Sequence, residues 1–153
     1  PDNLYSSIKN LAPNLFVAPP TISQYVALSS LNYGNFLNKI VKTYKKNMEL
    51  LYTELPKIGF RPVLKPEGSF YLYADISKIS NDSEKLCKNL LKKYGLVLTP
   101  GIDFDSKEGK KYVRFCYSYP EKEIIKGIKK LNSIFNWKYT HIFTILIFLS
   151  INL

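Results

Sequence analysis

The chain has 153 residues, of which 46% are hydrophobic, and its 22 lysine and arginine side chains against 12 acidic ones give a formal net charge of +10. That hydrophobic share excludes a disordered polymer, and seven glycines with nine prolines exclude a collagen-like chain. Two cysteines and one histidine exclude a disulfide framework and a zinc cluster. The length predicts one folded domain, and the cysteine and histidine counts predict no structural metal.

Nearly all of the positive charge comes from lysine, since Arg61 and Arg114 are the only arginines. The lysines are spread along the faces of predicted helices, which indicates a solvated surface and no nucleic-acid partner. Residues 1–20 lack the unbroken apolar run of a signal peptide, so we expect a cytoplasmic location.

The first residues predict two short helices and a connector. Residues 2–11 carry one apolar stripe, and Pro13 should end this helix because a proline removes a backbone hydrogen bond. Residues 14–20 should be extended, since residues before prolines avoid the helical region. Thr21 or Ser23 should cap the second helix. Three of its side chains are expected to point inward: Ile22, Val26 and Ala27.

A longer helix is predicted over residues 34–55, closed by Gly59. Six of its side chains recur at steps of three or four residues: Phe36, Ile40, Tyr44, Met48, Leu51 and Leu55. The pattern then changes to that of strands. Residues 60–64 form a short edge strand candidate, because Pro62 cannot donate to a ladder. Residues 69–75, rich in aromatic side chains, form the clearest strand.

The second half of the chain alternates strand and helix signals. Asn81 with Glu84 resembles a capping box, and it should open a helix that Gly95 closes. The segments that follow are a buried strand at 96–99, a charged loop at 102–111, a strand at 112–117, and a helix carrying Ile124, Ile125, Ile128, Leu131 and Phe135. The order after the long helix is ββαββα, which predicts an α/β fold with helices layered against one sheet.

Arg114 has the most informative chemistry in the chain. It lies in a predicted strand between Val113 and Phe115, which belong in a core, so its guanidinium needs a carboxylate or comparable acceptors. A planar, two-pronged grip on the carboxylate of a ligand is one explanation. An internal ion pair with Asp75 or Glu67, or outward projection from an alternating strand, is the other.

Five short motifs occur in the order and rough spacing of one enzyme family. They are Pro-Pro-Thr-Ile-Ser-Gln at 19–24, Pro-Glu-Gly-Ser-Phe-Tyr at 66–71, Tyr-Ala-Asp-Ile-Ser at 73–77, Thr-Pro-Gly-x-x-Phe at 99–104 and Val-Arg-Phe-Cys-Tyr at 113–117. Through this series, residues 1–137 resemble the carboxyl-terminal part of class I pyridoxal-phosphate-dependent aminotransferases, most closely the aspartate aminotransferase-like branch.

The resemblance implies a fold, a cofactor and a substrate. Residues 34–137 match the small C-terminal aminotransferase domain, and residues 1–33 match the end of the large domain with its connector. The implied cofactor is pyridoxal 5′-phosphate, the implied substrates are an amino acid and a 2-oxo acid, and Arg114 matches the arginine that binds the substrate α-carboxylate. Residues 1–20 contain no arginine, where dicarboxylate-specific relatives carry one, so a preference for aspartate has no support.

The same resemblance implies what the chain lacks. The family's Schiff-base lysine, its phosphate cradle and the aspartate that faces the pyridine nitrogen lie upstream of the matched region. We therefore expect no catalytic, cofactor-binding or metal-binding residue here, and a fragment that is not catalytic on its own.

Other functions stay open. One is half of a split aminotransferase, in which a second chain supplies the lysine. The expected partner is either that upstream half-enzyme chain or a second copy of this chain in a homodimer. Another is a noncatalytic remnant that associates with a membrane through residues 139–153. An RNA-recognition module, suggested by the aromatic strand at 68–73, is disfavoured because its element order is βαββαβ.

The tail at 138–153 breaks the pattern of the chain. From residue 139 it has no lysine, arginine or acid and no amphipathic period, and it is shorter than the about 20 apolar residues that cross a bilayer. We expect it to lie outside the fold, and a membrane role is not expected. Truncation after Trp137 should preserve cooperative unfolding and reduce aggregation, as followed by circular dichroism and light scattering. Loss of the cooperative transition would contradict this.

Overall fold

The computed structural model describes residues 1–135, so the predicted tail at 138–153 lies outside the described residues. The chain divides into two compact units after Ile40. The first unit contains α1 (Asp2–Phe16), α2 (Thr21–Ser30), the 3-10 turn η1 (Leu31–Tyr33) and the start of α3 (Gly34–Ile58). No residue of α1, α2 or η1 is buried. Among residues 1–135, no helix has the length and apolar character needed to cross a bilayer.

Helix α1 continues past Pro13 to Phe16, so the predicted end of this helix was wrong. The proline ring removes only its own N–H group, and the Pro13 carbonyl still accepts a hydrogen bond from the backbone N of Val17 at 3.1 Å. The connector is therefore restricted to residues 17–20, which lie between the two helices.

Helix α2 is confirmed, but its predicted cap is wrong. Pro20 occupies the cap position and no side chain caps the helix, so neither Thr21 nor Ser23 has that role. The φ of −52° at Pro20 already suits the start of a helix. The three side chains that were expected to point inward are exposed: Ile22, Val26 and Ala27.

The second unit is built on a four-stranded antiparallel sheet with the strand order β1-β2-β4-β3. The strands are β1 (Arg61–Pro62), β2 (Tyr71–Asp75), β3 (Thr99–Pro100) and β4 (Tyr112–Cys116). The edge position predicted for the Pro62 strand is confirmed. The buried strand predicted at 96–99 is wrong, because β3 is a two-residue edge strand and Val97 is 77% exposed. A short apolar run gives the same sequence pattern in a buried strand and in a segment that leads into an edge strand.

As far as residue 135, three helices contribute to this unit: most of α3, α4 (Ser83–Tyr94) and a helix that includes residues 121–135, called here the 121–135 helix. Asp82, not Asn81, caps α4, since its carboxylate accepts a hydrogen bond from the Lys85 backbone N at 2.9 Å. Gly95 ends α4 in the left-handed conformation, as predicted. Gly59 follows α3 with a φ of +99°. The predicted ββαββα order is therefore confirmed.

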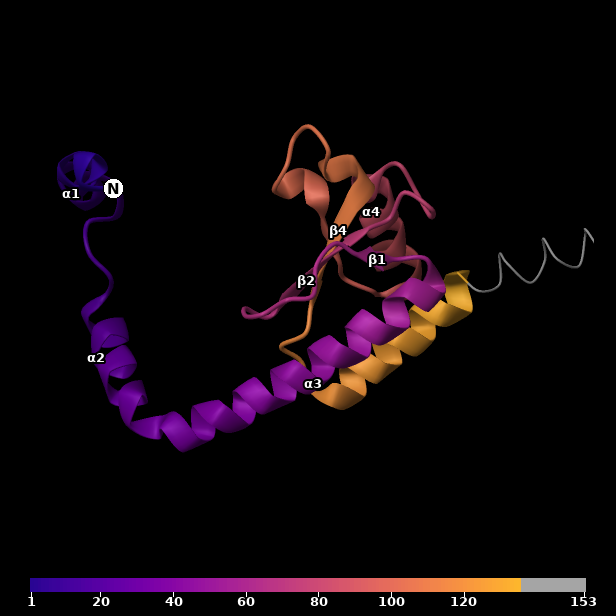
Figure 1. The fold of residues 1–153 in the computed structure, drawn as a ribbon, viewed down its shortest axis with the longest axis horizontal. Coiled ribbons are helices and arrows are strands. Elements are labelled where there is room, and N and C mark those ends of the chain that lie inside the picture. The colour runs from indigo at the N-terminus through magenta and orange to yellow at the C-terminus, as the bar shows by residue number, and fades with distance from the viewer. Residues whose placement is uncertain (136–153) are drawn as a thin grey trace, which may run out of the picture. The chain divides into compact units, whose positions relative to one another are not determined.

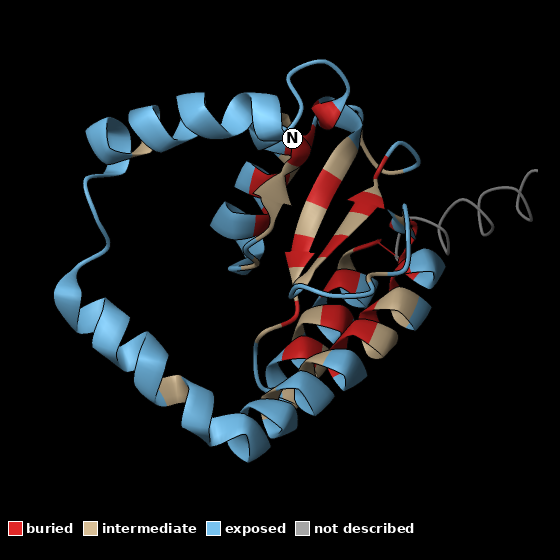
Figure 2. Cartoon of the chain, turned by 60° about the vertical axis from the view of Figure 1, so that its left-hand side comes forward, coloured by how far each residue is buried: buried red, intermediate tan, exposed pale blue. Residues whose placement is uncertain are grey.

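The core lies on one face of the sheet. Burial alternates along β2 and β4, where Leu72, Ala74, Val113 and Phe115 are buried and the residues between them are half-buried (Figure 2). The second half of α3 and the 121–135 helix run side by side, and both contribute to this core (Figure 1). The α/β layering expected from the sequence is thus present, and it leaves the opposite face of the sheet free of the helical core.

Candidate carboxylate-binding site

Arg114 lies on the half-buried face of the sheet, among aromatic side chains. It pairs with Tyr73 across the β2–β4 ladder and with Thr99 of β3. Its guanidinium carbon is 3.9 Å from the ring centroid of Tyr71 and 4.7 Å from that of Phe104. Its Nη2 donates to the Thr99 hydroxyl at 3.3 Å. Cation–π contacts on this scale fix the plane of the guanidinium.

One N–H group of the Arg114 guanidinium is buried without an acceptor. Its Nε has no hydrogen-bond partner among residues 1–135. None of the ion pairs within residues 1–135 includes Arg114, so the internal ion pair considered with Asp75 or Glu67 is not formed. A buried guanidinium N–H without an acceptor is costly. The two oxygens of a carboxylate ligand would provide acceptors for the N–H groups of this guanidinium.

Asp75 has a different partner. Its carboxylate forms an ion pair with Arg61 and accepts a hydrogen bond from the Ser77 backbone N at 2.6 Å. Burial raises the pKa of this carboxyl, but the hydrogen bonds from Ser77 and the charge of Arg61 outweigh it, and the pKa lies below its ordinary value. Arg61 is therefore engaged in a structural pair, and Arg114 is the arginine without an ion pair in residues 1–135.

The loop at 101–111 positions Phe104 over Arg114. It contains the 3-10 turns η2 (Gly101–Asp103) and η3 (Gly109–Lys111), which meet at Gly101 and Gly109. The Ser83 hydroxyl, buried at the start of α4, donates to the Gly109 carbonyl at 3.0 Å. Close approach of the two glycines closes the loop, because any side chain there would overlap the facing backbone.

Replacing Gly109 with alanine should destabilise the chain by at least about 1 kcal/mol. The added Cβ would overlap the backbone of Gly101, and Phe104 should move away from Arg114. Urea unfolding measures the change. Gly127→Ala is the matched control, since a Cβ on Gly127 meets nothing within 4 Å and alanine favours a helix. Equal stability of the two variants would contradict the role given to the glycine contact.

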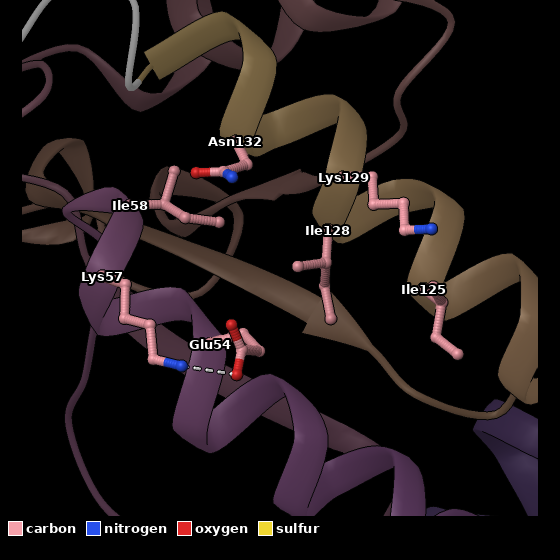
Figure 3. Close-up of a pocket in the computed structure, with 7 residues that line it drawn as sticks. All are labelled: Glu54, Lys57, Ile58, Ile125, Ile128, Lys129 and Asn132. Carbon is pink, nitrogen blue, oxygen red and sulfur yellow. Dashed lines mark hydrogen bonds and ion pairs between the residues drawn. The ribbon is translucent and has the colours of Figure 1, made fainter. Parts of the chain in front are cut away.

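Two of the hollows in the described part of the chain lie beside the 121–135 helix. One, of ≈ 530 Å³, is lined by residues of the 95–99 segment and the 121–135 helix, and by Arg114, Thr99 and Cys116. The other, of ≈ 330 Å³, lies between α3 and the 121–135 helix, with Ile58, Ile125 and Ile128 among its walls (Figure 3). At its rim Lys57 pairs with Glu54 at 2.7 Å. Within residues 1–135, no group of three or more His, Cys, Asp or Glu side chains is placed to hold a metal ion.

Comparison with known proteins identifies the family. The sequence model for aminotransferase class I and II matches residues 1–131. The chain belongs to this aminotransferase family. It is 31% identical to a valine–pyruvate aminotransferase of Mycobacterium tuberculosis over 140 residues, which cover 87% of this chain and 35% of the relative. It is 29% identical to an aspartate aminotransferase of Sulfolobus acidocaldarius over 139 residues, 88% of this chain and 35% of that protein.

Solved structures agree with this assignment. A crystal structure of an aminotransferase from Mycobacterium tuberculosis superposes with a TM-score of 0.74 at 32% identity, over 89% of this chain and 36% of that chain. The chain spans about 35% of the length of the curated relatives it matches.

The family implies pyridoxal 5′-phosphate, but the described residues do not fit it. A lysine that forms a Schiff base needs a sheltered, desolvated site that lowers its pKa. Every lysine within residues 1–135 is exposed, and the pKa values of Lys88 and Lys111 are raised by hydrogen bonds to Glu84 and Glu108. None of the lysines in this part of the aminotransferase chain is therefore placed to bind the cofactor aldehyde.

Tyr71, Thr99 and Phe104 are the neighbours of Arg114 that sequence reasoning did not assign. All three lie in motifs that the sequence analysis singled out, at 66–71 and 99–104. Their convergence depends on the register of β2 against β4 and on the loop closure at Gly101, neither of which a pattern of residue types specifies.

Proposed function

We propose that this chain provides the substrate-carboxylate grip of a pyridoxal-phosphate-dependent aminotransferase, with Arg114 binding the α-carboxylate of an amino acid or 2-oxo acid. The observation that carries the proposal is the Arg114 guanidinium, which is oriented by Tyr71, Phe104 and Thr99 yet has a buried, unpartnered Nε. Arg61 is paired with Asp75, so residues 1–135 offer no second free arginine for a dicarboxylate.

The proposal includes a division of labour within the family fold. Residues 34–137 act as the small domain and residues 1–33 as the end of the large domain and its connector. The cofactor and its lysine belong to the part of the aminotransferase fold that these 153 residues do not span, either in the same polypeptide or in a partner half-enzyme. The cytoplasm is the proposed location, which two free cysteines, Cys87 and Cys116, favour.

The direct test uses the full chain labelled with ¹⁵N-arginine, which contains only two arginines. The Nε–H of Arg114 should exchange slowly with solvent because it is buried, whereas Arg61 has a side chain that is 49% exposed. Titration with pyruvate should shift the Arg114 resonance and leave that of Arg61 in place. A shift of both resonances alike, or of neither, would contradict the proposed role of Arg114.

The isolated chain should not form an internal aldimine with pyridoxal phosphate. Lysines that are exposed and protonated are poor nucleophiles, so reduction with borohydride should yield only scattered, substoichiometric labelling. Mass spectrometry of the reduced protein locates any adduct. A stoichiometric adduct on one lysine, together with transamination of an amino acid, would overturn this expectation.

A further inference from the structure

Asn47 is a fully buried polar residue of α3, with 0% of its surface exposed. Its Nδ2 donates to the carbonyl oxygens of Tyr117 at 3.0 Å and of Tyr119 at 2.7 Å. Because both neighbours are acceptors, only the NH₂ end of the amide can face them. The Oδ1 atom is buried without a donor. Asn47 therefore joins α3 to the segment that follows β4.

Tyr117, which Asn47 contacts, also forms hydrogen bonds with the residues before β2. Its backbone N donates to the Phe70 carbonyl at 2.9 Å, and its hydroxyl donates to the Gly68 carbonyl at 3.0 Å. The first of these bonds continues the β2–β4 ladder beyond the pairing of Tyr71 with Cys116. The residue that Asn47 holds is thus the one that holds the chain immediately before Tyr71.

We propose that Asn47 is a positioning residue for the carboxylate grip, an inference that rests on the proposed function of Arg114. Arg114 stacks on Tyr71 at 3.9 Å across a diagonal of the same ladder. Without the amide of Asn47, two buried carbonyls lose their donor and the ladder end opens. Tyr71 then leaves the guanidinium, whose plane is no longer fixed.

The test compares variants of the full chain labelled with ¹⁵N-arginine. Asn47→Leu keeps the approximate volume of the side chain and removes both donors. Asn47→Ser keeps one hydroxyl donor and is the milder variant should the leucine variant fail to fold. Leu55→Ala is the control, because Leu55 is fully buried on the same helix and has an apolar side chain that cannot bond to Tyr117. Two readouts are measured: hydrogen exchange of the Arg114 Nε–H and the dissociation constant for pyruvate.

Asn47→Leu should speed the exchange of the Arg114 Nε–H and weaken pyruvate binding roughly tenfold, the equivalent of one charge-assisted hydrogen bond. Asn47→Ser should show smaller changes of the same sign. Leu55→Ala should lower the stability of the chain and leave both readouts unchanged. Readouts in the folded Asn47 variants that match those of Leu55→Ala would overturn the positioning role. A wild-type chain whose Arg114 signal ignores pyruvate would instead refute the proposed function, while the exchange rates still decide the role of Asn47.

Discussion

Replacing Phe60 with alanine should lower the free energy of unfolding by about 3–5 kcal/mol. Phe60 is fully buried, and only Gly59 separates it from the end of α3. Its ring packs edge-to-face on Phe115 of β4, with centroids 5.3 Å apart, and on Phe135 of the 121–135 helix at the same distance. Such pairs contribute beyond the area they bury. The substitution removes the ring that links the sheet to that helix, and the rigid elements around it cannot collapse to fill the space.

Urea unfolding followed by circular dichroism measures this loss as a lower midpoint at an unchanged slope. Phe36→Ala is the matched control, since the same atoms are removed from a side chain that is 61% exposed. The control should change the free energy of unfolding by less than about 0.5 kcal/mol. Equal losses in the two variants would contradict the placement of Phe60 at the centre of the core.

Arg114→Lys should weaken substrate binding by about 1.5–3 kcal/mol, which is the scale of a charge-assisted hydrogen bond. Lysine keeps the positive charge but loses the planar fork and the stacking on Tyr71. The effect requires a complete enzyme, so residues 1–137 are grafted onto the lysine-containing portion of a close relative, such as the valine–pyruvate aminotransferase of Mycobacterium tuberculosis. The ratio kcat/KM for an amino acid is measured in the two grafts.

The same substitution should change folding much less than binding. Arg114 has no ion pair within the described chain, so lysine at this position breaks no internal salt bridge. Thr99→Val serves as a control, because it removes the 3.3 Å contact with the guanidinium and keeps the charge and the fork. If the grafts with Arg114 and with Arg114→Lys have equal kcat/KM, or if the Arg114→Lys graft does not fold, Arg114 has a structural role and does not bind the substrate.

The sequence by itself determined the element order and the family, and it singled out Arg114 as the candidate site residue. Helical periodicity in α3 and the aromatic alternation of β2 are local signals, and the five motifs carry the family resemblance without any knowledge of their contacts. Local patterns were less reliable where two conformations share one signature. Pro13 did not end α1. The apolar run at 96–99 is not a buried strand, because only its last residue belongs to the edge strand β3.

Only the tertiary structure decided what surrounds Arg114. The register of β2 on β4 sets Tyr71 beneath the guanidinium, and a shift of one residue would place the whole set on the core face. Asp75, a candidate partner in the sequence, is taken by Arg61, which lies on the neighbouring edge strand. Such pairings join residues far apart in the chain, so they depend on strand order and loop closure. Residue type fixed the chemistry that Arg114 has available, and the fold of residues 1–135 leaves its Nε–H without an acceptor.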